Sequence, residues 1–336
     1  MHMNQISVYL LTDGVCASKE GGRLILRKDG EQRESLPLRL IDSVVAGRQT
    51  QISTQALFAL IQAGASVFYM DRRGRIVGHM GQGIPPDRLL RQIDCLREDH
   101  MGLLLARKMI KEKLRGQRMV LLRFTQRGRT ERVVQVCRAL QNSRKEAERA
   151  LSVSELMGIE GRAARMYFSA FSELLQATPF SWPGRSGRGA ADPVNGLLNY
   201  SYSFLEKEVR IAAAAARLDG RIGFLHANNG RKDSLIYDLM EPFRARISDR
   251  LVLTAVRRGL IGERDFSLDG GICCLMEQGR KAWISLYESY MGRPLQEIGG
   301  VSPREWVRAE IKRTARLIFE RHAEPDTSAG EGGGPA

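Results

Sequence analysis

Features of secreted, membrane-spanning and disulfide-stabilised proteins are missing from this sequence. Its five cysteines are odd in number and contain no C-x-x-C pair, and adjacent Cys273 and Cys274 are poor partners for a disulfide. No apolar run reaches the length needed to cross a bilayer, and residues 1–15 lack the basic start and long apolar core of a signal peptide. We therefore expect reduced, mostly buried thiols in a cytoplasmic protein with no membrane partner.

Several familiar active-site motifs are missing too. The sequence has no Walker A loop, Rossmann glycine fingerprint, HExxH zinc motif or GxSxG nucleophile motif. Acidic residues are comparatively scarce: the sequence has 38 Asp and Glu and 52 Lys and Arg, which gives a net charge of +14. A balance this basic indicates nucleic acid as the first candidate partner, ahead of an anionic membrane surface.

The N-terminal residues 1–80 carry mainly strand-like patterns. Runs of β-type residues are separated by turns rich in glycine and aspartate, and they lie at Ile6–Thr12, Arg23–Arg27, Ile41–Ala46, Ser66–Met70 and Ile76–His79. One helical stripe, which Ser53 or Thr54 can cap and Gly64 can end, interrupts these runs. The class predicted is α+β, in which residues 1–80 form a β-rich domain with one helix.

A helical period dominates the rest of the chain. Residues 81–88, with two glycines and two prolines, are predicted to be a linker, and residues 89–323 to be a larger all-α catalytic domain. The expected helices include Gly102–Leu114 and Met119–Phe124 as separate elements and Ser234–Gly259 as one. The final residues 324–336 have almost no apolar content and are predicted to be a disordered tail.

The densest group of chemically competent residues lies between Gly223 and Arg244. His226 precedes a predicted helix in which Asp238 and Glu241 share one face, and the turn-prone segment between them can fold the imidazole back toward that face. Imidazole and carboxylate groups are ligands for Mn²⁺, Mg²⁺ or Zn²⁺. With basic residues on either side, this pattern predicts metal-assisted phosphodiester chemistry. The competing interpretation is a structural histidine beside a solvated acidic helix face.

Pro242 directly follows this acidic pair. It lacks the N–H that would bond the Asp238 carbonyl, and its ring crowds that carbonyl, so a kink is expected at the acidic turn. A further acid is needed to complete a nuclease metal site, and Glu160 is a candidate because its predicted helix carries an apolar stripe. From the residues alone, however, a surface ion pair with Arg162 or Arg165 explains Glu160 better.

Candidate phosphate contacts come from the basic residues near these acids. Arg185 and Arg188 lie in a glycine-rich loop, and Lys232 and Arg244 flank the acidic helix. A run of charges is usually only a solvated face, so no single base is assigned by this pattern. The overall excess of positive charge nonetheless favours contact with a DNA backbone.

Six segments, in order along nearly the whole chain, resemble the CRISPR-associated spacer-acquisition integrases, which are metal-dependent DNA endonucleases. They are Leu10–Gly14, Gly64–Tyr69, Leu156–Phe168, Asp192–Tyr200, Gly223–His226 and Asp238–Arg244. The resemblance implies a β-rich N-terminal domain, an α-helical catalytic domain and a homodimer. It also implies that Glu160, His226 and Glu241 hold Mg²⁺ or Mn²⁺, with Asp238 as a nearby acid.

The activity implied by this resemblance is insertion of captured DNA fragments into a CRISPR repeat array. A 3′-hydroxyl attacks a phosphodiester, the substrate is double-stranded or branched DNA, and the expected partner is a small ferredoxin-like companion adaptation protein. Two alternatives stay open. One is a repair nuclease that cuts branched DNA without inserting spacers, and the other is a non-catalytic nucleic-acid-binding scaffold.

Overall fold

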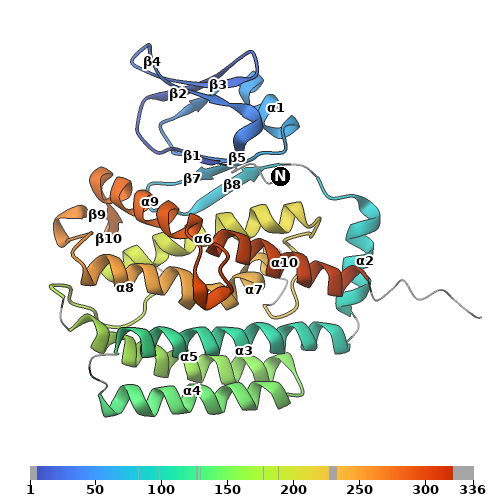
Figure 1. The fold of residues 1–336 in the computed structure, drawn as a ribbon, viewed down its shortest axis with the longest axis vertical. Helices are drawn as coiled ribbons and strands as arrows, with labels where there is room; N and C mark the ends of the chain where they lie inside the picture. The colour runs from blue at the N-terminus through green and yellow to red at the C-terminus, as the bar shows by residue number, and fades with distance from the viewer. Residues whose placement is uncertain are drawn as a thin grey trace, which may run out of the picture.

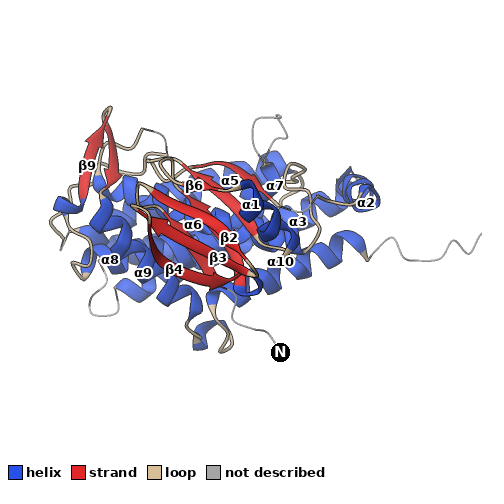
Figure 2. Ribbon diagram, turned by 90° about the horizontal axis from the view of Figure 1, so that it is seen from above, coloured by secondary structure: helices blue, strands red, loops and turns tan. Residues whose placement is uncertain are grey.

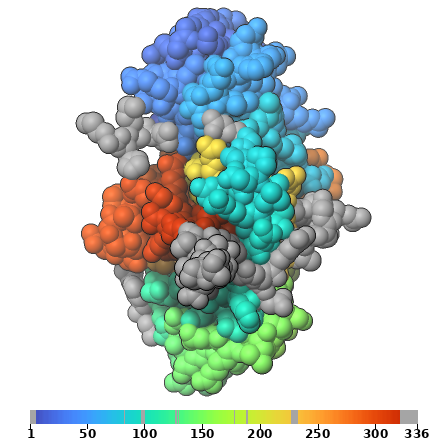
Figure 3. Space-filling model, turned by 90° about the vertical axis from the view of Figure 1, so that its right-hand side faces the viewer, coloured from blue at the N-terminus to red at the C-terminus, as the bar shows by residue number. Residues whose placement is uncertain are grey.

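A β-rich N-terminal part stacks on a larger helical part in the computed structural model (Figure 1), which confirms the predicted α+β class. The structure describes residues 6–320 apart from 82, 98, 126–127, 129, 177, 188 and 227–232. The predicted tail and the candidate bases Arg188 and Lys232 therefore lie outside the described residues. Figure 3 shows the same layering from the side, with the N-terminal residues at one end and the green helices at the other.

Two four-stranded sheets form the N-terminal part, and Figure 2 shows them from above. The sheet nearer the helices has the order β1-β5-β7-β8, from β1 (Ile6–Leu10), β5 (Ile41–Ala46), β7 (Ser66–Met70) and β8 (Ile76–Met80). Its first three strands are parallel, and β8 is antiparallel to β7. The other sheet has the order β4-β3-β2-β6, from β2 (Val15–Glu20), β3 (Arg23–Lys28), β4 (Glu31–Pro37) and β6 (Gln51–Ile52).

The sheet nearer the helices has apolar neighbours on both faces. Val44 and Val67 belong to the N-terminal core, whereas the adjacent residues Val45 and Phe68 belong to the core of the helical part. This double burial explains why the sequences of β5 and β7 are almost continuously apolar. By contrast, β2 and β4 were not predicted. Only Ala17 of β2 is buried and no side chain of β4 is, so neither sequence carries a marked apolar face.

One helix, α1 (Thr54–Gln62), packs against β2 and β7. The Ser53 hydroxyl accepts a hydrogen bond from Ala56 N, as predicted for its cap. Gly64 follows the helix with φ 84°, a left-handed conformation that glycine adopts without strain. The short 3₁₀ helix η1 (Leu38–Leu40) lies between β4 and β5.

The helical part starts earlier than predicted, because α2 begins at Pro86, inside the segment 81–88 taken for a linker. Proline fits the first turn of a helix, where its missing N–H costs nothing. The longer helices are α2 (Pro86–Arg97), α3 (Asp99–Phe124), α4 (Glu131–Arg149), α5 (Val153–Leu175), α6 (Pro193–Ala215), α9 (Glu277–Gly292) and α10 (Pro303–Phe319). Among the described residues, no helix is long and apolar enough to cross a membrane.

Three predictions about the helical part need correction. The two helices expected at Gly102–Leu114 and Met119–Phe124 are one continuous helix, α3. The part is also not all-α, because β9 (Phe266–Asp269) and β10 (Ile272–Leu275) pair as an antiparallel hairpin between η3 (Glu263–Asp265) and α9. Gly270 and Gly271 both have positive φ, which suits a tight hairpin turn. A last short helix, η4 (Gln296–Ile298), precedes α10.

The third correction concerns the segment predicted as one helix over Ser234–Gly259. It consists of α7 (Ser234–Phe243), the π-helical segment η2 (Arg244–Asp249) and α8 (Arg250–Arg257). Pro242 lies inside α7, and the π-helical hydrogen bonding begins two residues after it. The helical path therefore continues past the proline with a wider turn, a form often found at functional sites.

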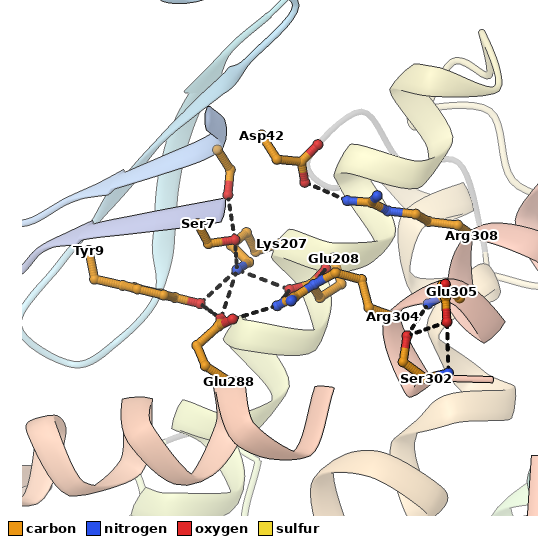
Figure 4. Close-up of polar contacts among 11 residues, drawn as sticks. Ser7, Tyr9, Asp42, Lys207, Glu208, Glu288, Ser302, Arg304, Glu305 and Arg308 are labelled. Atoms are coloured by element: carbon orange, nitrogen blue, oxygen red, sulfur yellow. Dashed lines mark hydrogen bonds and ion pairs between the residues drawn. The ribbon is translucent and has the colours of Figure 1, made fainter. Parts of the chain in front are cut away.

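A buried network of charged residues joins the two parts of the molecule (Figure 4). Lys207 of α6 is 1% exposed, and its Nζ donates to Ser7 Oγ (3.2 Å) and Tyr9 OH (2.7 Å) of β1. Glu208 Oε1 lies 3.0 Å from the same Nζ, and Arg304 of α10 bonds both Glu208 oxygens at 3.1 and 3.0 Å. We call this group, together with Glu288 of α9, the junction network.

Candidate active site

The segment before α7 wraps around the carboxylate of Asp238, which is fully buried. Asp238 Oδ2 accepts hydrogen bonds from Phe224 N (2.7 Å) and Leu225 N (2.9 Å), and Oδ1 accepts one from His226 N (3.0 Å). A side chain at Gly223 would collide with this carboxylate, since a Cβ atom there would lie 2.6 Å from Asp238 Oδ2. The Gly-Phe-Leu-His sequence therefore folds as an anion-binding loop that fixes the backbone of His226.

The imidazole of His226 is held by the same carboxylate. Its Nδ1 lies 2.6 Å from Asp238 Oδ1, and this hydrogen bond is the main reason that the pKa of His226 is raised, with Glu241 adding to the effect. With the Nδ1 proton directed at the carboxylate, Nε2 is the nitrogen left for a ligand. A carboxylate behind a histidine is typical of metal sites, where it orients the ring. Asp238, predicted only as a nearby acid, therefore positions His226.

Two glutamates from different helices meet at one lysine. Lys113 Nζ of α3 lies 2.6 Å from Glu160 Oε1 of α5 and 2.5 Å from Glu241 Oε2 of α7. Arg244 Nε lies 2.9 Å from the other Glu241 oxygen, Oε1. Burial opposes ionisation of Glu241, but Arg244 and Lys113 outweigh it and lower the pKa of Glu241 to about 2. Glu160 thus takes part in a half-buried ion pair with a lysine that the sequence did not single out.

A pocket of about 170 Å³ opens beside this pair of carboxylates. Helices α3, α5, α6 and α7, the segment η2 and the loop before α6 supply its wall: Lys113, Gln117, Glu160, Ala164, Phe168, Arg185, Tyr202, Glu241, Arg244, Ala245 and Asp249. Two of the four predicted DNA contacts, Arg185 and Arg244, therefore lie in the same wall as Glu160 and Glu241, whereas Asp238 and His226 do not line this pocket. We call this space the carboxylate pocket.

The far side of the carboxylate pocket is built around Asp249. Its carboxylate accepts hydrogen bonds from Tyr167 OH (2.9 Å) and Tyr202 OH (2.6 Å), and burial raises the pKa of Asp249. The guanidinium carbons of Arg244 and Arg185 lie 4.9 and 5.3 Å from the centre of the Tyr202 ring. The tyrosine thus holds two cations at the pocket wall through cation–π contacts.

The donor set at this site suits a divalent cation. In the described part of the chain, no three His, Cys, Asp or Glu side chains form a cluster that could hold a metal ion, so the ligand set of Glu160, His226 and Glu241 stays a prediction. Carboxylate oxygens and an imidazole are nevertheless ligands for Mg²⁺ and Mn²⁺. Glu241 Oε2 is also buried, and the Lys113 ammonium group lies 2.5 Å from it. A buried carboxylate oxygen that faces a cation also fits a metal ligand.

Comparison with known proteins decides the family. The family model described as CRISPR associated protein Cas1 matches residues 8–289, which is most of the chain. The chain belongs to the Cas1 family. A CRISPR-associated endonuclease Cas1 from Thermus thermophilus is 34% identical over 283 residues, covering 84% of this chain and 86% of that protein. The resemblance found in six short segments is thereby confirmed.

Solved structures show the same fold. A Cas1 protein from Thermotoga maritima has a TM-score of 0.80 at 24% identity, covering 94% of this chain and 97% of that one. A casposase bound to its integration product also has a TM-score of 0.80, at 22% identity over 94% of this chain and 91% of that one. At these identities the similarity shows the Cas1 fold alone.

Proposed function

We propose that this Cas1 protein is a metal-dependent DNA endonuclease and integrase that inserts captured DNA fragments into a CRISPR repeat array. The observation that carries the proposal is the meeting of Glu160 and Glu241 at one cation position beside the carboxylate pocket. The printed names of the relatives agree with this function, since one is an endonuclease and another is a casposase bound to an integration product.

Glu160, His226 and Glu241 would hold Mg²⁺ or Mn²⁺ in this proposal. Such an ion, when bound, polarises the scissile phosphate and balances the negative charge that develops on it. Asp238 keeps the His226 imidazole oriented with Nδ1 turned away, and Arg244 holds Glu241 in its ionised form. His226 is thereby kept in the orientation, and Glu241 in the protonation state, that a ligand requires.

Arg185 and Arg244 would bind the DNA backbone at the pocket wall. Both cations lie against Tyr202, and Arg185 is anchored by hydrogen bonds to Asn195 Oδ1 (3.1 Å) and Asn199 Oδ1 (2.8 Å). Anchored guanidinium groups of this kind contact phosphates and carry little base preference. In joining, the 3′-hydroxyl of the fragment forms a new phosphodiester as an existing one breaks, and water replaces that hydroxyl in cleavage. One phosphodiester is exchanged for another, so joining needs no ATP.

Assembly belongs to the same proposal. We infer a homodimer through the β-rich residues 1–80, linked by residues 81–85 to a helical catalytic domain that begins at Pro86. Joining both ends of a DNA fragment needs two active sites at a fixed separation, which one chain with one site cannot supply. A small ferredoxin-like companion protein would bridge two such dimers. Light scattering that finds a stable monomer, with efficient two-ended joining by that monomer, would contradict this assembly.

The decisive experiment is integration into a supercoiled plasmid that bears a CRISPR repeat, with and without the companion protein. Joined products that require Mg²⁺ or Mn²⁺ support the integrase. Cleavage of branched DNA without joining would instead favour the repair nuclease, and DNA binding without any metal-dependent product would favour the scaffold. In the same assay, His226→Ala should abolish cleavage and joining but leave DNA binding mostly intact, because different residues contact the backbone.

A further inference from the structure

A lysine side chain fills the space between the two carboxylates at the centre of the site. The side chain of Lys113 is 13% exposed, and its Nζ approaches both Glu160 Oε1 and Glu241 Oε2. Nζ donates a hydrogen bond to Glu160 Oε1 and forms an ion pair with Glu241 Oε2. The lysine thus balances the charge of both acids.

Lys113 and a divalent ion cannot both bind this pair of acids well. Lys113 and Arg244 already supply one positive charge for each of the two carboxylates. A divalent ion added to them would leave an excess of positive charge at a buried place, where like charges repel strongly. Arg244 is fixed by Glu241 Oε1 and the Tyr202 ring, so Lys113 is the cation that can move.

A further buried oxygen lies one turn along α3 from Lys113. Gln117 follows Lys113 by one turn of α3 and lines the same carboxylate pocket of about 170 Å³. The Gln117 side chain is 3% exposed, and its Oε1 has no hydrogen-bond partner among the residues that the structure describes. Residues one helical turn apart are neighbours, and a lysine side chain is flexible, so this oxygen is a candidate second acceptor for Nζ.

We infer that Lys113 is a resident counterion that holds Glu160 and Glu241 together in the free protein, yields its place to an incoming divalent ion and turns to Gln117. The inference rests on the metal dependence proposed above. Lys113 is a positioning residue in this scheme. It keeps two acids from repelling each other before the metal arrives, and its displacement weakens metal binding relative to the carboxylates alone.

The affinity of the full chain for Mn²⁺, measured without DNA by calorimetric titration, tests this inference. Lys113→Met keeps an aliphatic side chain of similar length and removes the ammonium group. Because displacing the lysine forfeits a charged hydrogen bond, the variant should bind Mn²⁺ about ten- to a hundredfold more tightly than the wild type. Lys113→Arg keeps the charge and should show no such gain.

Lys111→Met is the matched control, since Lys111 lies on the same helix but pairs with the exposed residue Glu148. Its Mn²⁺ affinity should equal that of the wild type. Unchanged or weaker binding by folded Lys113→Met would overturn the inference and leave the metal site standing. If Glu160→Gln and Glu241→Gln both kept the Mn²⁺ signal of the wild type, the metal site itself would be wrong, and the inference with it.

Gln117→Leu provides an independent test if Lys113→Met does not fold. The leucine removes the second acceptor for the ammonium group, so lysine displacement costs more and Mn²⁺ should bind about three- to tenfold more weakly. The variant retains both carboxylates and the lysine, so its Mn²⁺ site is otherwise unchanged. An affinity equal to that of the wild type would show that the lysine does not turn to Gln117, and the proposed exchange would fail.

Discussion

Two buried lysines lie among glutamates in different regions of this molecule, and their surroundings differ in one respect. Lys207 of the junction network has two hydroxyl acceptors and a carboxylate within 3.2 Å. Lys113 of the candidate site has two carboxylates within 2.6 Å, and it borders a pocket. The first lysine is enclosed by partners, whereas the second lies beside open space and an oxygen, Gln117 Oε1, that has no hydrogen-bond partner among the described residues.

This difference separates a structural charge cluster from a functional one. A buried polar network whose members are all paired stabilises one arrangement of the chain, and any exchange of partners costs free energy. An unpaired buried oxygen at a pocket is costly unless another molecule supplies its partner. Residue types alone do not distinguish the two regions, since both consist of lysine, glutamate and arginine. The two regions are distinguished by the number of satisfied hydrogen bonds.

The sharpest test of this comparison is the same substitution in both regions. Glu241→Gln should lower the rate of DNA joining by about a thousandfold, because preorganised charge at a reacting phosphate contributes that much to catalysis. Glu208→Gln should leave the rate per folded molecule unchanged. Rates come from plasmid joining assays, normalised to the folded fraction by circular dichroism. Equal losses of rate in both variants would abolish the distinction.

Removing each lysine should affect stability in different ways. Lys207→Met should lower the free energy of unfolding by about 3 kcal/mol, the low end of the range for a broken buried pair, because Arg304 still contacts Glu208. Mn²⁺ should not restore the stability of Lys207→Met. By contrast, Mn²⁺ should restore any stability that Lys113→Met loses. Urea denaturation with and without Mn²⁺ measures both. If Mn²⁺ restored the stability of Lys207→Met as well, the two lysines would not differ in the way described.

Acid should weaken the junction network in a defined range of pH. Burial opposes ionisation of Glu208, but Lys207 and Arg304 outweigh it and lower the pKa to about 2. A folded-state pKa below the unfolded value means that this contribution is complete at neutral pH. It is lost as pH falls from the unfolded pKa toward 2, by on the order of 2–3 kcal/mol. Glu208→Gln should lack this part of the pH dependence in acid titrations of unfolding.

The smallest effect is expected for a single phosphate contact at the pocket wall. Arg185→Ala should weaken DNA binding about three- to tenfold and reduce the slope of affinity against salt, on logarithmic axes, by about 1. Sequence preference should not change. Arg33→Ala, which removes an exposed arginine paired with Glu31 on β4, is the control and should leave the affinity unchanged. Fluorescence anisotropy between about 50 and 200 mM salt measures the slope.

The sequence located the part of the site that is local in the chain. Asp238, Glu241 and His226 were recognisable because helical spacing and a turn bring them together within a short segment. Their grouping survives in the structure, although Asp238 positions the histidine. Glu160 could not be assigned from its own surroundings, since a glutamate beside arginines reads as a surface ion pair. Family resemblance named it as a ligand.

Residues contributed by distant helices escaped prediction. Lys113 lies in a run of bases where nothing in the helical pattern marks one lysine as buried, and Gln117 and Tyr202 reach the pocket only through packing of α3 and α6. The hairpin of β9 and β10 also escaped prediction, because its two strands are only four residues long. By contrast, β5 and β7 were predicted because burial on both faces gives continuous apolar runs.

Because η2 is π-helical, the number of residues in this segment affects how the side chains of the site are aligned. In a regular α-helix, residue 249 would lie roughly 80° around the axis from residue 241. The wider turn over Arg244–Asp249 reduces that angle, and both Glu241 and Asp249 line the carboxylate pocket. Deleting one residue here would restore the ordinary helical repeat and leave Asp249 only about 20° around the axis from Glu241, because seven regular positions turn roughly 700°. Such a protein would keep the alignment of the two acids and lose one residue of the pocket wall, which no substitution achieves.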